Sequence, residues 1–110
     1  MHAMHDLKLS ALDLNLLVVL RALLTERHVT RAAKEVGLSQ SATSHALARL
    51  RELYGDPLLV RSGRALVLTP RAQHLLPQLR RGLQELESSV RGPAPFDPKL
   101  ARAEFRFGLD

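Results

Sequence analysis

The chain has 110 residues, of which 45% are hydrophobic, and this length fits one small globular domain with an appendage. Sixteen basic residues against eleven acidic ones give a formal net charge of +5, which favours a polyanionic partner such as nucleic acid or an acidic membrane surface. No cysteine is present, so the sequence excludes disulfide bridges, thiolate metal sites and cysteine nucleophiles.

The first predicted helix follows Asp13, a favourable N-cap residue, and extends to about Arg27. Leucine, valine and alanine recur on more than one of its faces, which predicts a helix buried at the centre of the domain. Its longest apolar stretch, 14–24, is interrupted by Asn15 and Arg21 and is shorter than the roughly 20 residues that span a bilayer. We therefore expect a soluble, cytoplasmic protein that has no membrane partner.

Two further helices are predicted on either side of a tight turn. Thr30 is expected to cap a short helix that ends at Gly37, and Ser39 to cap a longer helix that ends at Gly55. The residues expected to lock the two helices together are Val36, Leu38, Ala46 and Leu47. Because the small side chain of Ala33 also allows the helices to cross closely, this segment predicts a helix-turn-helix.

Two short β-prone runs follow, at 58–61 and 65–68, separated by a turn at 62–64 that contains a glycine. Two strands around such a turn predict a β-hairpin. Arg61 and Arg64 make this hairpin basic. A helix, a helix-turn-helix and a basic hairpin, in that order, predict a mainly α winged helix-turn-helix with a short β-hairpin wing.

A long helix is predicted to begin at Thr69 and Pro70, because threonine is a favourable N-cap and proline suits the first helical position. From Ala72 onwards, apolar residues recur at alternating steps of four and three, as in a coiled coil. At about 30 Å the helix is longer than so small a domain can cover, which favours dimerisation through this stripe. The alternative is that the stripe packs on its own domain. The residues assigned to dimerisation are Leu76, Leu79, Leu83, Leu86 and Val90.

The longer helix of the helix-turn-helix presents short polar side chains on the exposed face of its N-terminal end. The residues on this face are Gln40, Ser41, Thr43, Ser44 and His45, followed by Arg49 and Arg51. Such side chains can approach base edges in the major groove of DNA, where glutamine can pair with adenine. This face therefore indicates DNA recognition.

Four motifs carry a family resemblance. They are Thr30-Arg31-Ala32-Ala33, Leu38-Ser39-Gln40-Ser41-Ala42-Thr43-Ser44, Gly55-Asp56-Pro57-Leu58-Leu59-Val60-Arg61 and Leu68-Thr69-Pro70. In this order, within the span 12–90, they resemble the N-terminal signature of LysR-type transcriptional regulators. The segments 13–17 and 56–58 are similar to the branch of that family that contains nodulation and aromatic-degradation regulators.

The resemblance implies a transcriptional regulator that binds double-stranded DNA as a homodimer, at an interrupted inverted repeat, joined through antiparallel linker helices. By position, the longer helix reads the major groove, the shorter helix contacts phosphate, and the hairpin arginines place the wing on the DNA. Ser41 stands where the family usually has proline and Thr43 where it usually has valine, so the role of Thr43 as core residue or contact stays open. The complete set of predicted DNA contacts is Thr30, Arg31, Gln40, Ser41, Thr43, Ser44, His45, Arg49, Arg61 and Arg64.

The same resemblance divides the chain into three parts. Residues 1–68 are the winged helix-turn-helix DNA-binding domain, and 69–91 are the linker (dimerisation) helix. Residues 92–110 are a hinge and the first strand of a truncated effector-binding domain, which the alternating pattern at 103–109 supports. A small-molecule inducer is expected to bind that effector domain, through which a tetramer could also assemble.

The competing interpretation is a winged helix that serves as a protein-interaction or dimerisation module and never binds DNA. It would need an apolar or acidic surface on the longer helix, whereas this surface is polar and flanked by arginines. An enzyme is not expected, because the serines around His45 have no neighbouring carboxylate that would complete a catalytic triad. The five histidines share no spacing typical of a metal site, so neither a metal nor a cofactor is expected.

Overall fold

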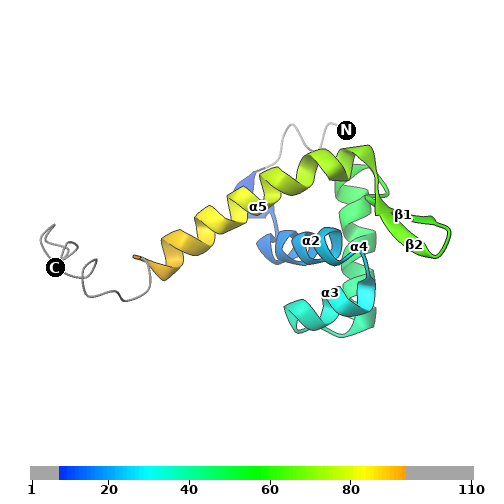
Figure 1. The fold of residues 1–110 in the computed structure, drawn as a ribbon. Coiled ribbons are helices and arrows are strands. Elements are labelled where there is room, and N and C mark those ends of the chain that lie inside the picture. Colours follow the sequence, from blue (N-terminus) through cyan, green and yellow to red (C-terminus); the bar gives the residue numbers. More distant parts are fainter. Residues whose placement is uncertain (1–7, 94–110) are drawn as a thin grey trace, which may run out of the picture.

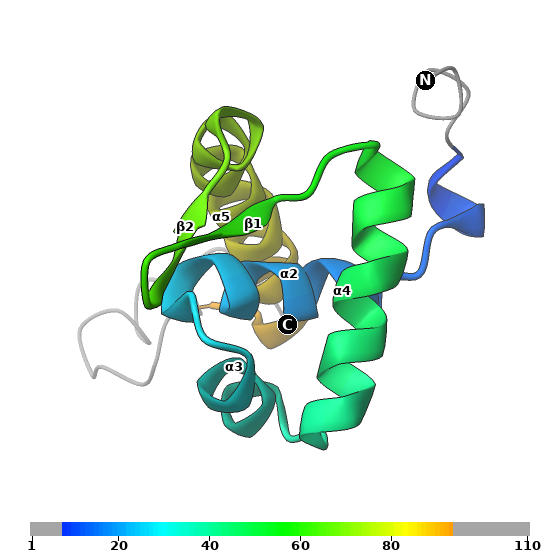
Figure 2. The same ribbon diagram turned by 90° about the vertical axis from the view of Figure 1, so that its right-hand side faces the viewer.

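The computed structural model describes residues 8–93, so most of the predicted hinge and strand at 92–110 lies outside the described residues. The elements are η1 (Leu9–Ala11), α2 (Leu14–Glu26), α3 (Val29–Val36), α4 (Gln40–Tyr54), β1 (Leu59–Ser62), β2 (Ala65–Leu68) and α5 (Pro70–Arg91). Their order confirms the predicted winged helix-turn-helix with a hairpin wing and a long helix after it (Figures 1 and 2).

Helix α2 lies at the centre of the domain, in contact with α3, α4 and α5. It begins after Asp13, whose carboxylate accepts a hydrogen bond from the Asn15 backbone N–H at 3.0 Å, as predicted for an N-cap. Leu20, Leu23 and Leu24 are buried beneath the surrounding helices. Because burying one leucine contributes about 1.5–3 kcal/mol, α2 anchors the fold.

The predicted cap of α3 was wrong. The helix begins at Val29, and Thr30 lies inside its first turn rather than before it. The cap is His28, whose Nδ1 accepts a hydrogen bond from the Arg31 backbone N–H at 3.2 Å. Histidine is not among the preferred N-cap residues, so the local pattern favoured the threonine.

A tight turn joins α3 to α4. Gly37 has a φ of 73° there, a left-handed conformation that glycine adopts without strain. Ser39 caps α4 as predicted, since its Oγ accepts a hydrogen bond from a backbone N–H of the first turn at 3.1 Å. Ala46 and Leu47 are buried where the helices cross, but Leu38 is 42% exposed and does not lock them together. Its backbone N–H closes α3, and its side chain remains outside the core.

The hairpin projects from the body of the domain as a wing (Figure 1). Its strands pair in antiparallel register with Ser62 opposite Ala65. The turn therefore consists of two residues, Gly63 and Arg64, rather than the three predicted. Gly63 has a φ of 63°, and glycine at the first central position suits a two-residue hairpin turn.

Helix α5 lies along α2 and then extends beyond the body of the domain (Figure 1). Leu76, Leu79 and Leu83, which the sequence assigned to dimerisation, are buried against elements of the same chain. The alternative that the stripe packs on its own domain therefore holds for this part of the helix. Leu86 and Val90 are 48% and 87% exposed, so the uncovered apolar surface of α5 lies near its end. Within residues 8–93, no helix combines the length and the hydropathy that crossing a bilayer requires.

Candidate nucleic-acid interface

The first turns of α4 form an exposed polar face. Gln40, Ser41, Ser44 and His45 are all exposed, and Arg49 is exposed one turn after His45. Residues three and four positions apart lie on the same side of a helix, so these side chains form one stripe. A stripe of polar side chains at a helix N-terminus is the arrangement by which recognition helices contact base edges.

Thr43 does not belong to this stripe. Its side chain is completely buried, and its Oγ1 donates a hydrogen bond to the Ser39 carbonyl oxygen at 2.9 Å. Threonine and valine have nearly the same shape, and the hydroxyl group finds its partner within the helix. Thr43 is therefore a core residue, which corrects its place in the predicted contact set.

Arg51 also leaves the predicted face. Its Nε donates a hydrogen bond to the Pro57 carbonyl oxygen at 2.8 Å, and its Nη2 donates one to the Leu59 carbonyl oxygen at 2.9 Å. The guanidinium group thus joins the last turns of α4 to the start of the hairpin. Arg51 therefore helps to hold the wing in position relative to α4.

The start of the hairpin is held from its other side by Asp56. The carboxylate Oδ2 accepts hydrogen bonds from the Leu58 backbone N–H at 2.8 Å and from Thr69 Oγ1 at 2.7 Å. Thr69 Oγ1 in turn accepts a hydrogen bond from the Ala72 backbone N–H at 3.1 Å, as an N-cap of α5. Leu58 is completely buried with a φ of 67°, a left-handed conformation that is strained for leucine. Asp56 therefore connects this strained residue to the first turn of α5.

An open groove of about 670 Å³ lies between the α2–α3 connection and the hairpin, which Figure 2 shows beside each other. We call it the wing groove. It brings together predicted contact residues from three separate parts of the chain, namely Thr30, Arg31, Gln40, Arg61 and Arg64. The fold thus assembles half of the predicted set on one surface, which opens beside the polar stripe of α4.

Positive charge dominates the wing groove. Four arginines and one glutamate line it, a surplus of three positive charges. The glutamate, Glu26, lies 3.5 Å from Arg31 Nε and orients that side chain. A surplus of arginine in an open groove attracts phosphate groups. This attraction becomes stronger as the salt concentration falls.

Sequence reasoning missed two residues of the wing groove, Arg27 and His28. Arg27 ends α2 in a left-handed conformation, with a φ of 52°, and is exposed. His28 caps α3 and is exposed as well. Their position directly before the Thr30-Arg31 motif was the signal that could have identified them, because residues adjacent to the start of a helix lie on the same surface as its first turn.

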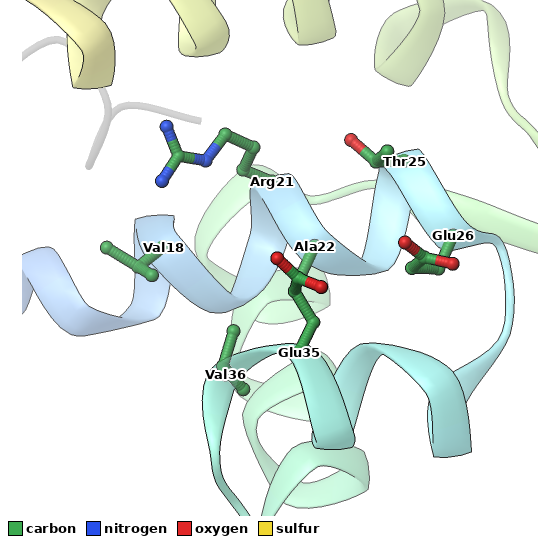
Figure 3. Close-up of a pocket in the computed structure, with 7 residues that line it drawn as sticks. All are labelled: Val18, Arg21, Ala22, Thr25, Glu26, Glu35 and Val36. Carbon is green, nitrogen blue, oxygen red and sulfur yellow. The ribbon is translucent and has the colours of Figure 1, made fainter.

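A second groove, of about 330 Å³, lies between α2 and α3 and is drawn in Figure 3. Its charged lining residues are Glu26, Glu35 and Arg21. It contains none of the predicted DNA contacts, and its carboxylates oppose the approach of phosphate. Among residues 8–93, no group of three histidine, aspartate or glutamate side chains is arranged to hold a metal ion.

Residues 14–73 match the family model described as bacterial regulatory helix-turn-helix protein, lysR family, and this span is more than half of the chain. The chain belongs to the LysR family. The match covers α2, the helix-turn-helix, the hairpin and the first residues of α5. It confirms the resemblance that the sequence motifs indicated.

Nodulation proteins are among the relatives of this LysR-family chain. It is 49% identical over 103 residues to "Nodulation protein D 1" of Mesorhizobium japonicum, which covers 94% of the chain and 33% of that protein. It is 46% identical over 103 residues to "Nodulation protein D 1" of Rhizobium tropici, with the same two shares. The chain therefore spans about a third of the length of these relatives.

Solved structures share the fold. A probable transcriptional regulator from Pseudomonas aeruginosa matches with a TM-score of 0.71 and 43% identity, over 82% of this chain and 30% of that one. The structure of BenM_DBD in a complex with benA site 1 DNA matches with a TM-score of 0.66 and 25% identity, over 73% of this chain and 90% of that one. The LysR-family chain is thus similar to a domain whose structure was solved on DNA.

Proposed function

We propose that this LysR-family chain is the DNA-binding part of a transcriptional regulator. The observation that carries the proposal is the wing groove, which collects Thr30, Arg31, Gln40, Arg61 and Arg64 beside the polar stripe of α4. The similarity to a DNA-bound domain supports the same assignment. A protein-interaction module without DNA binding is not favoured, because the exposed face of α4 is polar rather than apolar or acidic.

On double-stranded DNA, α4 enters the major groove and selects the sequence, while basic side chains around it contact the backbone. The proposed base contacts come from Gln40, Ser41, Ser44 and His45. The proposed backbone contacts come from Thr30, Arg31, Arg49, Arg61 and Arg64. Backbone contacts supply most of the affinity and make it fall with rising salt, and no catalytic step is involved.

A homodimer would form through the exposed end of α5. An apolar groove of about 440 Å³ lies there between α2 and α5, and Leu14, Val18, Leu83, Leu86 and Val90 are among its lining residues. A second copy can place its own α5 in this groove, because a two-fold interface uses the same surface on both subunits. Two-fold symmetry then requires an inverted repeat, with half-sites about 10 bp apart or a multiple of that distance.

The remaining parts of the chain extend this proposal. We assign 1–68 to the DNA-binding domain, 69–91 to the linker helix, and 92–110 to the hinge and first strand of an effector-binding domain. The nodulation relatives are about three times as long as the chain, which accommodates such a domain. A small-molecule inducer would bind it, tetramers would assemble through it, and the regulator would act in the cytoplasm.

Selection from a random duplex pool tests the proposed function, and Gln40→Ala tests how the sequence is read. The variant is expected to bind the selected site about tenfold more weakly, because the two hydrogen bonds between the glutamine side chain and a base are lost. Its affinity for random duplex should remain almost unchanged. Fluorescence anisotropy on both duplexes measures the two affinities. Gln84→Ala, an exposed glutamine on α5, is the matched control.

Two outcomes would count against these assignments. Equal losses on the selected and the random duplex would show that Gln40 does not read bases. If the original chain did not enrich any consensus sequence, this result would contradict the proposed function itself.

Replacing Leu86 and Val90 together by glutamine is expected to weaken the dimer about tenfold, because their apolar surface is no longer withdrawn from water in the interface. Sedimentation equilibrium of the free protein gives the dissociation constant. Ser88→Gln, an exposed position on the same helix, should leave the constant unchanged. An original chain that stays monomeric, or a double variant that dimerises as tightly, would contradict the proposed interface.

A further inference from the structure

Two polar contacts join α5 to α2, in addition to the buried leucines. Arg21 forms an ion pair with Glu87, with Nη2 2.7 Å from Oε2 and Nη1 3.4 Å from Oε1. One turn further along α2, Thr25 Oγ1 accepts a hydrogen bond from Arg80 Nη2 at 3.1 Å. Figure 3 shows Arg21 and Thr25 both pointing from α2 toward α5. Directional contacts therefore hold α5 at two points along its length.

The ion pair lies where α5 leaves the body of the domain. Leu83 is buried, and Glu87 follows it by one turn on the same side of the helix. Glu87 also lines the apolar groove that we assign to the second copy. The hydrogen bond from Arg21 lowers the pKa of the Glu87 carboxyl group, so the carboxylate is charged at neutral pH and loses this contact only in acid.

A small change in the direction of α5 would have a large effect on a dimer built through its end. From Leu76 to Val90 the helix spans about 21 Å, so a tilt of about 10° moves its end by about 4 Å. One base pair of DNA rises by about 3.4 Å. Contacts between leucines are non-directional and so specify the angle of α5 less sharply than an ion pair with two hydrogen bonds does.

We propose that the Arg21–Glu87 ion pair holds α5 in one direction relative to α4 and thereby sets the half-site separation that the dimer selects. Both are positioning residues, which act through the direction of α5 and contact neither bases nor phosphates. The inference rests on the proposed function and adds to it a determinant of operator spacing inside each protomer.

The test is selection from a pool in which two copies of the half-site are separated by every spacing from contact to about two helical turns. The original chain is expected to enrich one spacing. Glu87→Ala is expected to enrich the same half-site. Its preference for the original spacing over the neighbouring spacings should be about threefold weaker, which is the size of effect expected for an exposed ion pair. Glu85→Ala, an exposed glutamate on the same helix, is the matched control and should behave as the original chain.

The exchange of charges, Arg21→Glu with Glu87→Arg, separates the ion pair from a general effect on the helix. It is expected to restore the original spacing preference, whereas Arg21→Glu alone should broaden it further through repulsion. An unchanged preference in Glu87→Ala, together with an unchanged half-site, would overturn the inference and leave the proposed dimer intact. Enrichment of single half-sites by the original chain would instead overturn the dimer, and the inference with it.

Discussion

The free energy of unfolding of the Asp56→Ala variant is expected to be about 2–4 kcal/mol smaller than that of the original chain. The Asp56 carboxylate accepts hydrogen bonds from the Leu58 backbone N–H and from Thr69 Oγ1, and both contacts are partly buried. Hydrogen bonds to a charged group contribute about 1.5–3 kcal/mol each, and partial exposure reduces their sum. Leu58 also loses the contact that supports its left-handed backbone.

Urea denaturation followed by circular dichroism measures this free energy. Asp56→Asn is the matched control, and it should lose less stability because its side-chain carbonyl oxygen still accepts a hydrogen bond. Thr69→Val removes the hydroxyl group from the same network, so its effect and that of Asp56→Ala should not add in the double variant. A loss below about 1 kcal/mol with additive effects would show that the carboxylate does not hold the start of the hairpin.

Replacing Arg61 and Arg64 together by alanine is expected to weaken binding to every duplex about 10- to 100-fold at about 0.1 M salt. Both arginines line the wing groove, where they add to the surplus of positive charge. Each phosphate contact contributes about 0.9 to the slope of log affinity against log salt, so the slope should fall by about 2. Titrations at several salt concentrations, on the selected site and on random duplex, measure both quantities.

The control for this pair is Lys8→Ala with Arg81→Ala, which removes the same charge from exposed positions that line neither the wing groove nor the apolar groove of α5. Because charges further away than about 10 Å are screened at this salt concentration, the control should weaken binding by less than about threefold. Equal losses in the two double variants would show that only net charge matters. A loss confined to the selected site would show that the wing reads bases instead of contacting phosphate.

Helix starts and the order of elements were predictable from the sequence. Asp13, Ser39 and Thr69 were each predicted as N-caps, and each accepts a backbone hydrogen bond from the helix that it starts. Such contacts depend on residues within one helical turn of each other, which a linear pattern contains. The same local rules failed at His28, because the preference for threonine outweighed a histidine that the folded chain uses as a cap.

The candidate interface was predictable in part. The pattern placed Gln40, Ser41, Ser44 and His45 on one exposed face, and the structure keeps them there. It also placed Arg51 on that face, whereas the structure turns its guanidinium group toward the hairpin. A helical period shows which residues share a side of the helix, but the element that approaches that side comes from elsewhere in the chain.

Caps and periodicity were thus sufficient to predict a winged helix-turn-helix, and the resemblance of its sequence motifs was sufficient to predict its family. The folded chain was needed to show that the first leucines of the α5 stripe are covered by their own domain and that Leu86 and Val90 are not. It was also needed to bring Arg21 to Glu87, 66 residues away. The reason is physical: partners distant in sequence meet because many burial contributions add up over the whole domain, and no local pattern contains that sum.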